Sequence, residues 1–168
     1  MANIVIVDKA ASTPEDRTNQ INIPISIVNV AEPKIAEFGL SVQQGEIHNF
    51  VELNGVVAVQ SDVSTPSDQF EYILVRLRRR NTTTLPPEAE PGTIIFATRA
   101  SLEGGGKIVS IGFSFTEGGV DGSIPSGYYS YTMHISRMVG LGPTVNAATA
   151  PFITGPIQFT GNSYIKNN

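Results

Sequence analysis

The stretch that decides the fold is residues 129–135, YSYTMHI, in which an apolar residue occupies every second position from Tyr129 to Ile135. Successive side chains of a β-strand point to opposite faces, so a period of two predicts a strand with one buried face. The same period recurs at residues 109–115, VSIGFSF, and at residues 21–27, INIPISI. Three such stretches in one chain predict a β protein.

Further strands are expected on both sides of these stretches. Residues 70–80, FEYILVRLRRR, predict a strand whose Ile73, Val75 and Leu77 face inward. Other expected strands are 51–60, 93–100, 157–165 and a short one at 38–42. Loops rich in Gly and Pro separate them, among them 64–68, 85–87, 104–106 and 118–127, and these residues supply the backbone angles of tight turns. The pattern predicts an all-β protein, an antiparallel β-sandwich of the jelly-roll type.

Composition narrows the possible functions. The chain has 168 residues and no cysteine, which excludes disulfides and thiolate metal sites. Its net charge of −4 argues against a nucleic-acid partner, whose phosphates require a basic face. The start of the chain lacks the basic region of a Sec signal peptide, and no apolar run is long enough to cross a bilayer. We expect no membrane partner, and release outside the cell by lysis of a mother cell or of a phage host.

No group of residues predicts catalysis. The chain has two histidines, His48 and His134, which we expect to be solvated at the surface, and it has no recognised catalytic motif. Glu117 with Asp121 could chelate calcium, but a plain solvated loop is favoured. The glycines at 104–106 predict a hairpin turn and not a phosphate-binding loop. We therefore expect no enzyme, no catalytic residue, no cofactor and no metal.

Four arginines near the end of the strand at 70–80 form a basic stripe. Arg76 and Arg78 share its outward face, and Arg79 and Arg80 stand at its end. Charged side chains on a strand commonly deter edge-to-edge aggregation, and that interpretation is favoured. The alternative is a docking stripe for an acidic neighbour, such as the 88–90 loop of another subunit.

The N-terminal residues 1–30 predict an arm attached to a body at residues 31–168. A short apolar run at 4–7 is followed by the polar stretch 11–20, ASTPEDRTNQ, and then by an Ile-rich strand at 21–30. The Ile-rich strand could pair within its own sandwich or with a neighbouring subunit, whereas exchange with a neighbour is favoured for 4–7. The candidate subunit-interface residues of the arm are Ile4, Val5, Ile6, Val7, Ile21, Ile23, Ile25 and Ile27.

Two stretches carry a resemblance to a known family. Residues 124–132, IPSGYYSYT, and the tail 159–165, FTGNSYI, resemble strands of the tumour-necrosis-factor-like jelly rolls found in exosporium proteins of spore-forming bacteria. The arm and small jelly roll also resemble the subunits of endospore appendage fibres. The resemblance covers about 40 of the 168 residues. It implies a structural protein of the spore surface whose partners are copies of itself, with an anchoring or tip protein as a further partner.

The function expected from the sequence is therefore a subunit of a self-assembling extracellular or spore-surface fibre. In this hypothesis each subunit inserts its N-terminal arm into the next, head to tail. One alternative is a capsid or decoration protein of a virus or phage. Another is a carbohydrate- or receptor-binding module that uses the loop at 118–127 for recognition.

Overall fold

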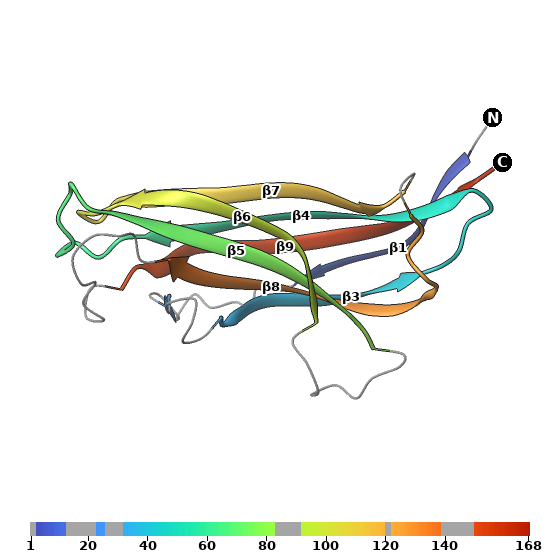
Figure 1. Cartoon of the computed structure of the whole chain (residues 1–168), viewed down its shortest axis with the longest axis horizontal. Helices are drawn as coiled ribbons and strands as arrows, with labels where there is room; N and C mark the ends of the chain where they lie inside the picture. Colours follow the sequence, from blue (N-terminus) through green and yellow to red (C-terminus); the bar gives the residue numbers. More distant parts are fainter. Residues whose placement is uncertain (1–2, 13–22, 26–31, 83–91, 120–121, 139–149) are drawn as a thin grey trace.

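The computed structural model describes residues 3–12, 23–25, 32–82, 92–119, 122–138 and 150–168. These residues form two antiparallel sheets stacked face to face, with the strands along the longest axis of the molecule (Figure 1). The expected all-β sandwich is confirmed. Within the described residues no helix is long and apolar enough to cross a membrane.

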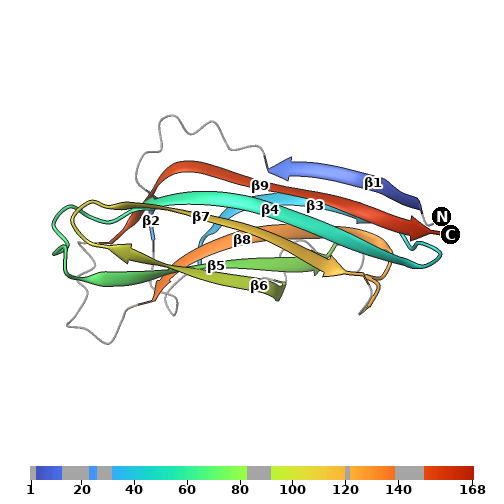
Figure 2. The same ribbon diagram turned by 90° about the horizontal axis from the view of Figure 1, so that it is seen from above.

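The first sheet has the order β1-β9-β4-β7, and the two-residue strand β2 also pairs with β9. Figure 2 shows this order from the edge strand β1 to the edge strand β7. Its strands are β1 (Asn3–Ser12), β2 (Ile23–Pro24), β4 (His48–Gln60), β7 (Ile108–Gly118) and β9 (Phe152–Asn167). The second sheet has the order β3-β8-β5-β6, from β3 (Lys34–Val42), β8 (Gly127–Met138), β5 (Phe70–Asn81) and β6 (Thr93–Glu103).

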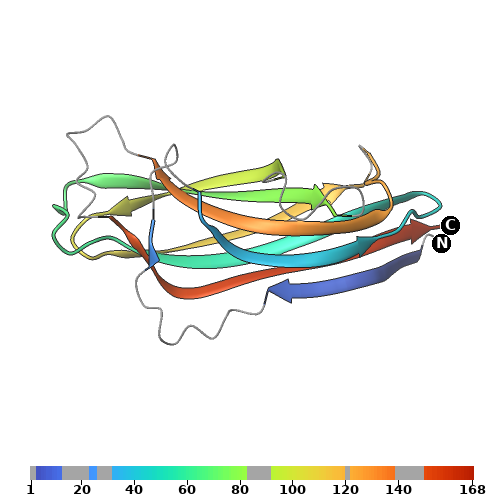
Figure 3. The same cartoon turned by 90° about the horizontal axis from the view of Figure 1, so that it is seen from below.

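The long strands pair in a nested way that defines the jelly roll. With β2 set aside, the first strand pairs with the last, the second with the second-last, the third with the sixth, and the fourth with the fifth. This nesting wraps two sheets around one core. It also places β1 and β3 at one side of the sandwich and β6 and β7 at the other, while the two termini lie at the same end (Figure 3).

The core forms from the inward phase of each strand. Phe159 of β9 is fully buried, with its ring 4.5 Å from that of Phe38 on β3 and 6.1 Å from that of Phe113 on β7. The inward residues predicted for the strands at 70–80 and 129–135 are confirmed as buried: Ile73, Val75, Leu77, Tyr129, Tyr131, Met133 and Ile135. Burial of these apolar side chains between the sheets stabilises the fold.

One buried amide fixes the loop before β8. The Asn49 side chain is 1% exposed, donates hydrogen bonds to the carbonyl oxygens of Gln43 (2.8 Å) and Ile124 (2.7 Å), and accepts one from the Ile124 N–H (2.7 Å). A side chain that satisfies three backbone groups at once can replace a regular turn. A turn forms at 104–106 as predicted, but it is not a hairpin, because β6 and β7 belong to different sheets and do not pair. Gly105 and Gly106 in this crossing turn have φ of 74° and 76°, a conformation that favours glycine.

Candidate functional site

The edge strand β1 carries a row of exposed apolar side chains. Ile4, Val5 and Ile6 are 59%, 47% and 57% exposed. In the described part of the chain β1 pairs only with β9, so its other edge offers backbone groups without a strand partner. An apolar strand edge of this kind is a ready template for another strand.

A β-bulge divides β1 into two halves. The register with β9 shifts between Ile6 and Asp8, which turns the Asp8 side chain inward toward the second sheet. Asp8 Oδ2 accepts a hydrogen bond from the Ser41 N–H of β3 at 2.7 Å, and its Oδ1 accepts one from the Lys9 N–H at 2.8 Å. Ser163 of β9 donates to the Ser41 carbonyl at 2.7 Å. These bonds join the edges of the two sheets.

This geometry differs from the arm expected from the sequence. The run Ile4–Val7 lies in β1, a strand of ten residues that pairs with β9 of the same chain. The extended N-terminal arm is therefore not confirmed. Ile25 is 1% exposed, lies in the core and donates its N–H to the Pro151 carbonyl at 2.8 Å. Ile23 belongs to β2, and Ile21 and Ile27 lie outside the described residues.

An aromatic pair extends the apolar surface from β1 across the outer face of the first sheet. Ile6 is the register partner of Tyr164 on β9, and Tyr164 is the register partner of Phe50 on β4. The Phe50 and Tyr164 rings stack with centroids 4.7 Å apart, and Tyr164 donates to Glu52 Oε2 at 2.9 Å. Ile4 and Ile6 with these two rings form one patch, here named the outer patch.

The other edge of the same sheet, β7, carries no charge over most of its length. From Ile108 to Thr116 it contains neither a charged residue nor proline, and its outward residues Ser110, Gly112 and Ser114 are small. Within the described residues β7 pairs only with β4. Strands at the edges of sheets usually carry charges that deter pairing, and β7 has none before Glu117.

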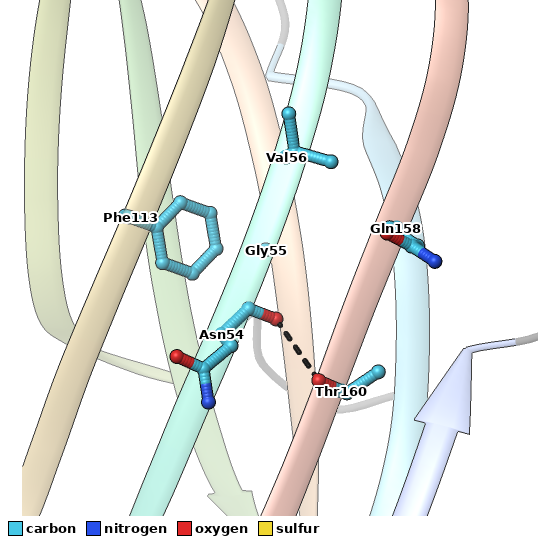
Figure 4. A pocket seen from close by; sticks show the side chains of 6 residues that line it. All are labelled: Asn54, Gly55, Val56, Phe113, Gln158 and Thr160. Carbon is cyan, nitrogen blue, oxygen red and sulfur yellow. Dashed lines mark hydrogen bonds between the residues drawn. The ribbon is translucent and has the colours of Figure 1, made fainter.

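A shallow hollow lies on the outer face beside β7 (Figure 4). Its volume is about 180 Å³, and its walls are Asn54, Gly55, Val56, Phe113, Gln158 and Thr160. Gly55 leaves room for the Phe113 ring, since a Cβ there would lie 2.4 Å from that ring. The hollow contains no titratable group, so we assign it no chemistry.

The basic stripe is neutralised within the chain. Glu32 holds both outward arginines, with Oε2 accepting from Arg78 Nη2 at 3.0 Å and Oε1 accepting from Arg76 Nη1. Arg79 points inward instead and pairs with Glu117 of β7 at 2.5 Å. Arg80 adds positive charge near Glu37. For Arg76, Arg78 and Arg79, acidic partners are thus supplied by this chain.

Glu117 lies inside the sandwich and not in a solvated loop. Its carboxylate accepts from the Tyr131 hydroxyl at 3.3 Å and pairs with Arg79, whose guanidinium also lies 5.3 Å from the Tyr129 ring centre. Burial raises the pKa of Glu117 despite the Arg79 charge. Asp121 lies outside the described residues, and among those described no three His, Asp or Glu side chains gather as a metal site would need.

His134 was expected at the solvated surface, and that prediction is wrong. The ring is half-buried, with Nδ1 2.9 Å from the Glu32 carbonyl and Nε2 3.0 Å from Thr132 Oγ1. Since a carbonyl only accepts, Nδ1 carries the proton of the neutral ring. Burial, together with the charges of Arg78 and Lys34, lowers the pKa of His134 to about 4. The other histidine, His48, is half-buried at the start of β4, 6.3 Å from the Phe50 ring.

Sequence reasoning missed the two acidic residues that organise these clusters. Glu32 and Asp8 each bind partners from strands distant in sequence, and neither stands in a motif. The outer patch was missed for the same reason, because its rings come from β4 and β9. One signal was available for Asp8, since it directly follows the apolar run at 4–7 and ends it, which suggests a local change in the strand.

No protein-family model matches the chain, and no curated protein matches it. Among solved structures it is similar to the D431N mutant VP2 protein of infectious bursal disease virus in T=1 particles, with 9% identity and a TM-score of 0.40 over 99% of this chain and 40% of that one. A structure of the Gx strain of the virus gives 8% identity and a TM-score of 0.38, again over 99% and 40%. This chain spans about two fifths of those chains, and likeness at this level carries no argument about what it does.

Proposed function

We propose that this chain is a structural subunit that assembles with further copies of itself through the open edge of β1. The observation that carries the proposal is the exposure of Ile4, Val5 and Ile6 on a strand whose second edge has no partner strand among the described residues. A soluble domain that stays alone normally protects such an edge with charge, proline or a covering segment. The absence of catalysis, the spore-surface setting and the extracellular location stay predictions from the sequence.

The size of the β1 contribution limits how copies can join. Fully burying an Ile or Val side chain contributes about 1.5–3 kcal/mol, and these three are already about half covered. Their further burial supplies roughly 3 kcal/mol, against an association cost of about 4–15 kcal/mol. Backbone hydrogen bonds and additional surface from the neighbouring edge of the second sheet must therefore contribute.

The test compares two apolar-to-lysine changes in light scattering and electron microscopy over a range of protein concentrations. Ile6→Lys places a charge at the β1 edge and should strongly reduce assembly. Val63→Lys is the matched control, because Val63 is 79% exposed in the turn after β4, and it should assemble like wild type. Wild-type protein that stays monomeric at every concentration would overturn the proposal. Filaments and closed shells are both compatible with it.

A further inference from the structure

We infer that β7 is the edge that receives β1 of the next copy, so that the first sheet continues from copy to copy without closing. The inference rests on the proposed self-assembly and identifies its second surface. The occupant of the β7 edge is a second copy of this chain. Four features of the described residues support this pairing: strand direction, strand length, the edges of the second sheet and the area available.

Strand direction is correct for pairing without turning the molecule over. Each neighbour in the order β1-β9-β4-β7 is antiparallel, so β1 and β7 of one chain run in opposite directions. A copy placed beside β7 in the same orientation therefore presents its β1 antiparallel to β7. The strands also match in length, with ten residues in β1 and eleven in β7.

The side chains at this junction are compatible. Ile4 and Ile6 point outward from β1, and the register that sets Ala11 opposite Ser110 sets them beside Ser114 and Thr116, which are on the outward face of β7 near the open surface at Gly112. A Cβ added to Gly112 would have no atom nearer than the Gly55 carbonyl at 4.0 Å, so the surface beside it is open. Branched side chains can pack over such a surface, as cross-strand neighbours do in one sheet.

The second sheet continues across the same junction. Asp8 binds Ser41, which places the edge strand β3 beside β1, and Phe96 lies 5.0 Å from Phe115, which places the edge strand β6 beside β7. Bringing β1 of one copy to β7 of another therefore brings β3 to β6. These strands also meet antiparallel, because β3-β8-β5-β6 alternates throughout.

Charge favours the second pair of edges. Arg99 is exposed near the middle of β6, and Glu37, which pairs with Lys34 and is still 38% exposed, lies near the middle of β3. With the strand centres aligned, the guanidinium of one copy faces the carboxylate of the next. Opposite charges directly across two strands stabilise their pairing. In a two-fold contact of β1 with β1, the β3 strands of the two copies would meet instead, and the Glu37 carboxylates of the two copies would lie side by side.

The contact is large enough for a stable interface. A ten-residue strand is about 33 Å long, and stacked sheets lie about 10 Å apart. The edge of the sandwich, with both sheets and their side chains, therefore measures about 33 by 20 Å. That area corresponds to about 1,300 Å² counted over both partners, within the range of about 1,200–2,000 Å² of specific interfaces.

The geometry also predicts the form of the assembly. Four strands about 4.8 Å apart give a rise of about 19 Å for each copy, with strands perpendicular to the axis. The twist of about 20–25° per strand adds about 80–100° of rotation for each copy. A head-to-tail contact that does not close produces a helical filament.

Disulfide cross-linking tests the pairing, because the chain has no cysteine of its own. Ala11→Cys on β1 and Ser110→Cys on β7 lie on opposite edges of one sheet, three strand spacings or about 14 Å apart across it, and they are also offset along the strands, since Ala11 is level with Ser114. This distance exceeds the reach of a disulfide, about 7 Å between Cα atoms. The two single variants, mixed under a mild oxidant and treated in parallel with a short bis-maleimide, are read on a non-reducing gel. Val63→Cys, exposed in a turn, is the control.

We expect mixed dimers from Ala11→Cys with Ser110→Cys, none from either variant alone, and a ladder from the double variant. Dimers of Ala11→Cys alone would overturn the inference in favour of a two-fold β1–β1 contact. Assembly seen by light scattering with no cross-link above the Val63→Cys level would overturn the β1–β7 pairing while leaving self-assembly intact. A monomeric protein in light scattering would overturn both.

Discussion

Replacing His134 with glutamine should remove a specific part of the pH dependence of stability. In the folded protein the pKa of His134 is lowered from 6.5 to about 4, first by burial and then by the charges of Arg78 and Lys34. The folded state therefore holds fewer protons than the unfolded state between those two values, so stability is lost as pH falls from about 6.5 to about 4. Glutamine retains a donor and an acceptor near the Glu32 carbonyl and does not titrate.

The magnitude follows from the size of the shift. Each pKa unit corresponds to about 1.4 kcal/mol, so the difference between 6.5 and about 4 sets an upper value of about 3 kcal/mol. The ring is half-buried, and solvent screening reduces that value. We expect wild type to lose about 1–2 kcal/mol more than His134→Gln between pH 7 and pH 4, or about 2–8 °C in melting temperature for a chain of this length.

The assay is urea denaturation of both proteins at a series of pH values and at a concentration below assembly. A difference measurement is needed because burial raises the pKa of Glu71 and Glu117, so these carboxyls add stability as pH falls toward their ordinary value. Identical pH profiles for wild type and His134→Gln would refute the reasoning.

Three further predictions concern the contacts that hold the sandwich together. Asn49→Ala should lower the free energy of unfolding by about 3 kcal/mol in urea titrations, since three hydrogen bonds at about 1 kcal/mol each are lost, whereas the exposed Asn54→Ala should change it by less than about 0.5 kcal/mol. Deleting residues 1–12 should lower it by about 2 kcal/mol or more, because nine cross-strand pairs with β9 are removed at about 0.2–1 kcal/mol each; unchanged melting in calorimetry would mean that β1 adds nothing to its own sheet. Glu32→Gln should destabilise by about 1–2 kcal/mol by leaving two neighbouring arginines without an anion, and added salt should reduce the difference; a salt-independent difference would contradict the ion-pair explanation.

The strands and their inward faces could be predicted because those properties are local. Alternation from Tyr129 to Ile135 and from Val109 to Phe115 reports burial directly, and both stretches lie in β8 and β7 as expected. The turn at 104–106 also follows from local chemistry, since glycine accepts the positive φ that the turn requires. That it crosses between two sheets, and is not the expected hairpin, depends on the partners of β6 and β7. The local sequence pattern was sufficient to predict a feature wherever that feature did not depend on which distant strand the residue pairs with.

Partners distant in sequence could not be predicted in this way. The run at 4–7 suggested a free arm because nothing in it identifies β9, more than 150 residues away, as its partner. Arg79 was grouped with its neighbours, yet it faces inward because its register partner on β8 is the buried Tyr131. Period-two reasoning assigns faces only while a strand stays regular, and the bulge between Ile6 and Asp8 is such an interruption.

The nested pairing of strands has a consequence for how the chain folds during synthesis. The last strand, β9, lies between β1 and β4, with Asn3 opposite Asn167 and His48 opposite Lys166. The first sheet cannot form its centre until the ribosome has released residue 167, so native contacts of high sequence separation form late and folding is slow. Until then the strand that pairs with both β1 and β4 is missing, so both have an open edge. Exposed strand edges of this kind make incompletely folded chains prone to aggregation. We expect a chaperone that shields the emerging β1 to raise the yield of native protein more than one that acts after release.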